Sequence, residues 1–268
     1  MLARKKSLIR MSKDEKMSCR FMVCGVEHSG TTLVSDLFRQ VAGVDSGFEV
    51  GVLLKECPVE FLELQPFADN MLEGWKISQL QLEEACAEKT FDEFYVKLME
   101  LSPAISTETQ YVFDKTPRYL SQLSACLKKT DKPFIACYKD PRATVFSDYK
   151  RSKAAEFAPW YNTYLPGKLR YLKICYREYE TNKDNHRVEF IALEDLALNA
   201  RNSMERIFRH VDLQFDLNYV VMNDLRYKNT HSNSVSIPIA FAYRNEFDQE
   251  TQNAIERDFS ELSDWFYR

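Results

Sequence analysis

The stretch FMVCGVEHSGTTLVSDLF, residues 21–38, constrains the fold of this chain more than any other segment, because an apolar run leads there through a glycine-containing turn into an amphipathic segment. MVCGV (22–26) has the composition of a buried strand, and TTLVSDLFRQV (31–41) carries its apolar residues at helical spacing up to Gly43. The turn has the G-x4-G spacing of a phosphate-binding loop. The segment therefore predicts a strand, a loop and a helix whose N-terminus binds an anion.

Short apolar runs alternate with segments of helical period along the rest of the chain, which predicts an α/β fold with a central parallel β-sheet flanked by helices. Further strands are expected at 111–113, 134–138 and 188–193, and helices at 79–101, 118–129, 142–153, 167–180, 200–211 and 250–266. We expect residues 21–268 to form a single domain. Residues 1–20 are strongly basic and are expected to be a disordered tail, with a membrane-surface anchor as the alternative.

Composition excludes some classes of function. The net charge of -4 argues against a nucleic-acid partner, because phosphate contacts call for a basic surface. The seven cysteines show no CxxC spacing, so we interpret them as buried free thiols. Apolar runs of about 18 residues and a secretory signal are both missing, so we expect a cytoplasmic protein without stable membrane association.

The predicted loop differs from that of a nucleotide kinase in one position, because Thr31 stands where the kinase lysine belongs. Kinase loops use that lysine and magnesium to manage the charge of a transferring phosphoryl group. Here the backbone N–H groups and the Ser29, Thr31 and Thr32 hydroxyls are left to hold one tetrahedral anion, with Gly30 allowing close approach. We expect this anion to carry less charge than a triphosphate, without a metal. A turn that binds nothing is the alternative.

A second candidate phosphate site lies in YKDPRATVFSDY, residues 138–149, directly after a predicted central strand. Lys139, Arg142 and Ser147 fall within one strand-to-helix turn and the first helical turns, and together they suit a phosphate. Taken alone, the two basic residues are equally typical of solvated charges at a strand edge and a helix start.

Together the two motifs resemble those of sulfotransferases that use 3′-phosphoadenosine 5′-phosphosulfate (PAPS). In that family G-x-x-[RK]-[ST]-G-T-T binds the 5′-phosphosulfate and [RK]-D-P-R-x(4)-S binds the 3′-phosphate. FDKTPRYL (113–120) and VEFIALEDL (188–196) resemble further landmarks of the family in the same order, so the resemblance spans most of residues 21–211. It implies a P-loop-like sulfotransferase fold, PAPS as donor, the bisphosphate PAP as product and no metal.

The chain departs from the family pattern at two positions. His28 stands where the family usually has arginine or lysine, so a permanent cation is replaced by a side chain that exchanges its proton around neutral pH. We expect His28 to act both in phosphosulfate binding and in catalysis. Leu193 replaces the tyrosine common before the E-D-L triplet, so one contact with the cofactor is expected to be missing.

Sulfuryl transfer needs a base for the acceptor and a cation for the leaving group. The resemblance implies that Glu49, in the loop after the first helix, is the base, as a glutamate is in the tyrosylprotein branch. The cytosolic branch uses a histidine, which leaves His231 and His186 as alternatives, whereas His210 is expected to be structural. Lys115, in D-K-T-P at a strand end, is the expected cation; a salt bridge with its neighbouring aspartate is the alternative.

The acceptor is less constrained by the sequence. The aromatic segment 156–166 is typical of a lid or pocket wall, or else of packing under a loop. Residues 228–244 take the place of the loop that closes over the nucleotide, so Lys228 or Arg244 is expected to contact the 3′-phosphate. The overall negative charge favours a small neutral or cationic acceptor, such as a natural product, over a polyanion. The sequence is compatible with a homodimer. The two competing functional hypotheses are a P-loop kinase and an inactive nucleotide-binding homologue.

Overall fold

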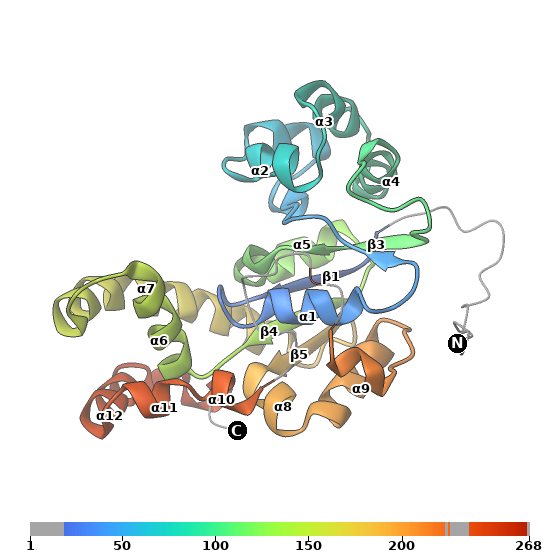
Figure 1. Ribbon diagram of the computed structural model, residues 1–268. Coiled ribbons are helices and arrows are strands. Elements are labelled where there is room, and N and C mark those ends of the chain that lie inside the picture. Colours follow the sequence, from blue (N-terminus) through green and yellow to red (C-terminus); the bar gives the residue numbers. More distant parts are fainter. Residues whose placement is uncertain (1–18, 223–224, 226–235, 267–268) are drawn as a thin grey trace.

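The computed structural model describes residues 19–222, 225 and 236–266. In this part of the chain, parallel strands form one sheet in the order β2-β3-β1-β4-β5 (Figure 1), so the predicted parallel sheet is confirmed. The tail predicted for residues 1–20 lies outside the described residues, apart from Cys19 and Arg20, which already belong to β1. The strands are β1 (Cys19–Gly25), β2 (Val44–Asp45), β3 (Tyr111–Lys115), β4 (Phe134–Tyr138) and β5 (Val188–Ala192).

The central strand β1 is apolar on both faces because helices cover both sides of the sheet. Phe21 and Val23 point into one buried cluster, and Met22 and Cys24 into the other. The first cluster is completed by α1 (Thr31–Phe38), α8 (Leu193–Leu198) and α9 (Ala200–His210). The second is completed by α4 (Phe91–Leu101), α5 (Leu123–Lys129) and α7 (Phe157–Asn182).

Two further groups of elements border the carboxyl edge of the sheet. Figure 1 shows α2 (Phe67–Gly74), α3 (Gln79–Cys86) and α4 together at the top of the view, on the β3 side. At the lower left it shows α6 (Pro141–Ser152), α10 (Ile237–Ala240), α11 (Tyr243–Glu246) and α12 (Gln249–Asp258). The short elements are α13 (Ser263–Phe266) and the 3₁₀ helices η1 (Val52–Leu54), η2 (Pro58–Glu63), η3 (Pro117–Gln122), η4 (Leu217–Val220) and η5 (Ser260–Leu262).

The helix predicted over 79–101 is two helices, α3 and α4. Each begins with a complete capping box, formed by Ser78 with Gln81 and by Thr90 with Glu93. The Thr90 box therefore starts a new helix in the middle of the predicted one. Similarly, the helix predicted over 118–129 begins as the 3₁₀ turn η3, with Pro117 at its N-terminus.

Candidate active site

A cavity of about 690 Å³ opens at the carboxyl ends of the strands. His28 follows β1, Pro117 follows β3, Lys139 follows β4 and Leu193 follows β5, and all four line the cavity. In parallel α/β sheets this edge is where ligands bind, because the loops that follow the strands converge there. Residues of α1, α2 and α6, the segment from α10 to α11, and Glu49 supply further parts of the wall.

The loop between β1 and α1 has the geometry of an anion cradle. His28 and Gly30 adopt positive φ angles of 66° and 92°, which turn the chain sharply into α1. The φ of 92° at Gly30 favours glycine, and a Cβ there would also lie 2.8 Å from Leu193 Cδ1. No side chain caps the N-terminus of α1, so its first N–H groups stay open for a ligand beside Thr31 and Thr32, which line the cavity.

Ser29 is placed differently from the two threonines. Its side chain is buried, and its hydroxyl donates a hydrogen bond to the carbonyl oxygen of Cys137 at 3.0 Å. In this structure the Ser29 hydroxyl therefore fastens the loop to β4.

His28 is oriented by a partly buried carboxylate. Its Nδ1 lies 2.6 Å from Oδ1 of Asp148 on α6, and Oδ2 of Asp148 accepts hydrogen bonds from Tyr164 (2.6 Å) and Lys168 (2.8 Å) on α7. Burial alone would raise the pKa of Asp148, but the hydrogen bonds from His28, Lys168 and Tyr164 and the Lys168 charge lower it below its ordinary value. An ionised carboxylate only accepts, so Nδ1 carries a proton, and Nε2 is left for the cavity that His28 lines.

The second motif places a buried lysine in the cavity wall. Lys139 is 2% exposed, and its Nζ donates to Ser147 Oγ at 2.8 Å; both residues line the cavity. Burial lowers the pKa of Lys139 to about 8. No carboxylate pairs with this ammonium within the described ranges. Arg151, one turn after Ser147 on α6, also lines the cavity.

Arg142 is not part of the cavity wall. Its guanidinium binds the carboxylate of Asp140, with Nη2 at 2.6 Å from Oδ2, and lies over the ring of Tyr243. Asp140 also caps α6, and its own N–H donates to Glu194 of the E-D-L triplet. Arg142 therefore shapes the turn that presents Lys139, instead of facing the predicted phosphate.

Glu49 and Lys115 meet directly. Lys115 Nζ lies 2.8 Å from Glu49 Oε1, and Lys115 is 3% exposed, whereas Glu49 lines the cavity. The structure thus brings together the two residues predicted as base and cation. The alternative role for Lys115 was a salt bridge with Asp114. In the structure Lys115 forms its salt bridge with Glu49.

Asp114, fully buried at the end of β3, holds the segment that carries Glu49. It accepts hydrogen bonds from the hydroxyls of Tyr95 and Tyr119, both at 2.6 Å, and from Thr116 at 2.7 Å. Its Oδ1 also accepts the N–H of Val50, adjacent to Glu49. Burial raises the pKa of Asp114, and the hydrogen bonds from Tyr119, Tyr95 and Thr116 oppose that rise.

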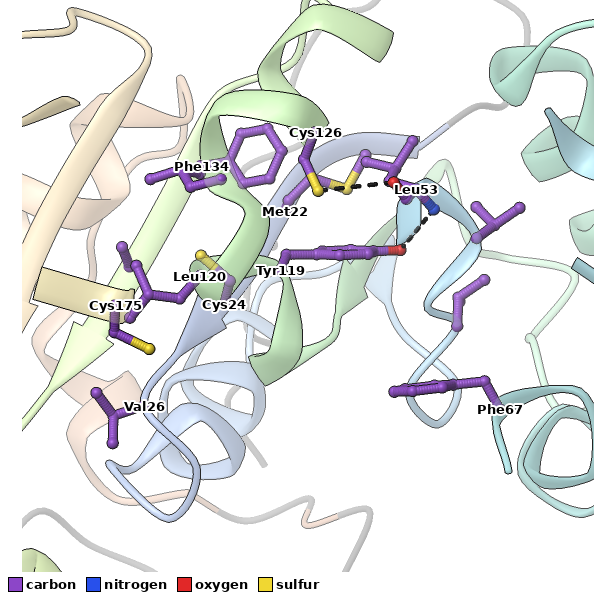
Figure 2. Close-up of a cluster of buried hydrophobic side chains, with 14 of the residues drawn as sticks. Met22, Cys24, Val26, Leu53, Phe67, Tyr119, Leu120, Cys126, Phe134 and Cys175 are labelled. Atoms are coloured by element: carbon purple, nitrogen blue, oxygen red, sulfur yellow. Dashed lines mark hydrogen bonds between the residues drawn. The ribbon is translucent and has the colours of Figure 1, made fainter. Parts of the chain in front are cut away.

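The same network extends to η1. Figure 2 shows the ring of Tyr119 with its hydroxyl directed at Leu53, and the sulfur of Cys126 directed at the same residue. Leu53 N–H donates to Tyr119, and its carbonyl accepts from Cys126 and from Lys129. The chain after Glu49 is therefore tied to the sheet at Val50 and Leu53.

The remaining predicted residues lie elsewhere. Arg244 is exposed on α11, with its guanidinium over the Phe241 ring, and does not line the cavity. His186 precedes β5, at the amino edge of the sheet opposite the cavity, and His210 ends α9. Lys228 and His231 lie outside the described residues.

The aromatic segment 156–166 is not a lid. It forms the first turns of α7, where Trp160 stacks on Tyr164 with ring centroids 4.4 Å apart and packs against Tyr149. The cavity lining contains no residue of this segment. The segment packs against neighbouring elements, which corresponds to the second interpretation that the sequence allowed.

Four polar residues of the site were missed by sequence reasoning: Asp148, which holds His28; Asp114, which holds the Glu49 segment; and the cavity-lining arginines Arg118 and Arg151. A signal was available for three of them. Asp148 directly follows the motif Ser147, Arg151 lies four residues after it, and Arg118 lies three residues after Lys115.

The described residues contain no group of three histidine, cysteine, aspartate or glutamate side chains placed to hold a metal ion. None of the helices in residues 19–222 and 236–266 has both the length and the apolar character that crossing a membrane requires.

Several solved structures share the fold. The sulfotransferase domain of the olefin synthase from Synechococcus PCC 7002 aligns over 94% of this chain and 95% of its own, with a TM-score of 0.65 and 16% identity. The sulfotransferase domain of the curacin biosynthetic pathway aligns over 93% and 99%, with a TM-score of 0.61 and 15% identity. Mouse sulfotransferase SULT7A1, solved in complex with PAP, aligns over 91% and 84%, with a TM-score of 0.53 and 13% identity.

No curated protein sequence matches the chain. The model of the sulfotransferase family, in contrast, matches residues 20–217, which include the anion loop, Glu49, Lys115 and the Lys139–Ser147 pair. That span is well over half of the 268 residues. The chain therefore belongs to the sulfotransferase family.

Proposed function

We propose that this protein transfers the sulfuryl group of PAPS to a hydroxyl or amine of a small-molecule acceptor. The observation that carries the proposal is that one cavity is lined by two separate groups of residues that are each suited to bind an anion. One is the uncapped N-terminus of α1 with Thr31 and Thr32, and the other is the pair Lys139 and Ser147. A nucleotide with phosphates at both its 3′ and 5′ positions matches two such sites. The complex of mouse SULT7A1 with PAP supports the same donor.

The residues present fit this donor electrostatically. Lys139 is buried and donates a hydrogen bond to the Ser147 hydroxyl, and desolvation lowers its pKa to about 8. A 3′-phosphate would supply the missing counter-charge and would restore the ammonium form. The open N–H groups at the start of α1 favour an anion in the same way, because they carry the positive end of the helix dipole. PAPS would bring an activated sulfuryl group to this end of the cavity.

Residues of this chain can then accept the proton of the acceptor hydroxyl and stabilise the charge that develops on the leaving phosphate. In the transfer, a bond forms between the acceptor oxygen and sulfur, while the bond between sulfur and the 5′-phosphate oxygen breaks. Glu49 takes the proton from the acceptor hydroxyl, and the electron pair of the broken bond stays on the phosphate. Lys115, held 2.8 Å from Glu49, donates hydrogen bonds to the oxygens on which charge builds, and Nε2 of His28 donates as well when the imidazole is doubly protonated.

Turnover with purified protein tests this proposal. We expect PAP to form from PAPS when a panel of phenols, alcohols and amines is supplied, without added magnesium. We expect no ADP to form when ATP and magnesium replace PAPS, since Thr31 occupies the position of the kinase lysine. ADP formation would favour the P-loop kinase. Tight PAP binding without turnover on any acceptor would favour an inactive homologue.

A further inference from the structure

One part of the cavity is lined by residues that lie beside the chain segment after Glu49. Thr116 Oγ1 accepts the N–H of Gly51, so the residues after Lys115 lie beside those after Glu49. Gly51 has a φ of 80°, and a Cβ there would lie 2.6 Å from the Phe67 ring, so Phe67 packs closely on this segment. Phe67, Asn70, Pro117 and Arg118 line this part of the cavity, which we call the acceptor arm together with Pro66.

The walls of the acceptor arm are largely apolar. Phe67 is 6% exposed and is held by its contact with Gly51, and Pro66 and Pro117 present rigid rings that lose little conformational freedom on binding. Asn70 is the neutral polar group of this arm. Such a wall favours an acceptor with a hydrocarbon body.

The net charge of the acceptor arm comes from Arg118. Lys115 and Glu49 form an ion pair and cancel each other. The Arg118 carbonyl accepts a hydrogen bond from Ser121, and its guanidinium has no ion pair with any residue in the described ranges. Arg151, the other cavity-lining arginine, belongs to the donor side, since it follows Ser147 on α6 and its charge acts on Lys139.

We propose that the acceptor is an amphipathic hydroxy-anion: its hydrocarbon body lies against Phe67, its carboxylate or phosphate binds Arg118, and its hydroxyl reaches Glu49. This inference rests on the sulfuryl-transfer function proposed above. A guanidinium suits either anion, because its forked N–H groups donate to two oxygens at once. Bound in this way, the acceptor is oriented by two points, with the hydroxyl directed at the base. The positive acceptor arm differs from the expectation of a neutral or cationic acceptor, which was based on the charge of the whole chain.

The test measures acceptor binding apart from turnover. The full-length protein is first titrated calorimetrically with adenosine 3′,5′-bisphosphate, which reports on the donor site alone. The saturated protein is then titrated with 8-hydroxyoctanoate, its methyl ester and 8-hydroxyoctyl phosphate. We expect either anion to bind at least about tenfold more tightly than the ester, because a charge-assisted bidentate contact is lost in the ester.

Two variants locate the effect. Arg118→Gln should abolish the preference for the anions while leaving ester binding and bisphosphate affinity within about twofold of wild type. Arg170→Gln, which changes an exposed arginine of α7 outside the cavity lining, should keep the preference. The two anionic probes distinguish a carboxylate from a phosphate acceptor.

Three results would overturn the inference: equal binding of ester and anions by the wild-type protein, equal loss of all probes in Arg118→Gln, or no binding of any probe at millimolar concentration. A loss of bisphosphate affinity in Arg118→Gln would place Arg118 in the donor site and also contradict the inference. Failure of the wild-type protein to bind the bisphosphate is a separate outcome, which contradicts the proposed function first.

Discussion

Nδ1 of His28 lies 2.6 Å from Oδ1 of Asp148, so the histidine of the anion loop is held by a partly buried carboxylate on α6. The family motif usually has arginine or lysine at the His28 position. Asp148, whose pKa is lowered chiefly by hydrogen bonds from His28 and Lys168 against the effect of burial, stays ionised and keeps Nδ1 protonated. The departure from the motif is therefore accompanied by a partner that fixes the imidazole toward the cavity.

Replacing either member of this pair should slow transfer. We expect His28→Ala to lower kcat/KM by at least about tenfold, and His28→Arg to keep activity close to wild type, because a cation is retained. Asp148→Asn should also lower kcat/KM by about tenfold, since it removes the orienting charge. In the His28→Ala background, Asp148→Asn should cost little more, because its effect acts through the imidazole. Steady-state kinetics of the four proteins, with thermal melts to monitor folding, checks this; additive effects would contradict it.

The affinity for adenosine 3′,5′-bisphosphate should fall as the pH rises above about 8. Burial lowers the pKa of Lys139 to about 8, and a bound 3′-phosphate would raise it again. Binding therefore requires proton uptake between these two pKa values, and the association constant should fall by about tenfold per pH unit there, while it stays level below pH 8. The charges that act on Lys139 include those of Asp148, Glu194, Lys168 and Arg151.

Calorimetry from about pH 7 to pH 10 measures this dependence. Adenosine 5′-monophosphate, which has no 3′-phosphate, serves as the control for other titrating groups and should not show the Lys139 slope. Lys139→Arg, which keeps its charge throughout this range, should bind the bisphosphate with little pH dependence. An equal slope for Lys139→Arg would assign the titration to another group.

Glu49→Gln should lower kcat by about 100-fold or more, because the amide cannot accept the acceptor's proton. Bisphosphate affinity should remain within about twofold, since the anion sites are untouched. Glu56→Gln is the matched control: Glu56 lies on the same stretch of chain but is exposed, and its ion pair with Lys129 contributes little. Rapid-quench measurement of one turnover decides the point, and an unchanged chemical step in Glu49→Gln would move the role of base to another residue.

The hydroxyl of Tyr119 should contribute measurably to stability. The Tyr119 hydroxyl donates a hydrogen bond to buried Asp114 at 2.6 Å and accepts one from the N–H of Leu53. Tyr119→Phe therefore removes one hydrogen-bond partner from each of these two buried groups. We expect the free energy of unfolding to fall by about 1.5–3 kcal/mol in urea denaturation. Tyr176→Phe, at a partly exposed tyrosine of α7 whose hydroxyl makes no hydrogen bond within the described residues, should change the free energy of unfolding by less than about 0.5 kcal/mol. Equal losses in the two variants would remove the special role of the Asp114 network.

Local patterns predicted the parts of the fold that depend on neighbouring residues. β4 matches its predicted bounds, because five consecutive apolar residues between Pro133 and Lys139 are typical of a buried parallel strand. β2, with only Val44 and Asp45, is too short to show any period and forms by pairing with β3. The first turns of α7 contain Pro159 and resembled a loop, yet a proline is tolerated in the first turn of a helix, where its missing N–H has no partner to lose.

The candidate site likewise contains some residues that the sequence indicates and others that only the folded structure reveals. Thr31, Lys139 and Ser147 lie in short motifs whose spacing was enough to nominate them, and His28 was nominated by the resemblance to the family motif; all four line the cavity. Asp148 holds a residue 120 positions away in the sequence, a contact that only the folded chain reveals.

The most direct test of the central claim is a calorimetric comparison of adenosine 3′,5′-bisphosphate with ATP plus magnesium. The bisphosphate should bind at one site per chain, and Lys139→Met and Ser147→Ala should each weaken it by at least about tenfold while leaving adenosine 5′-monophosphate unaffected. Tighter binding of magnesium–ATP, or equal loss of the monophosphate in both variants, would contradict two phosphate sites joined by one nucleotide.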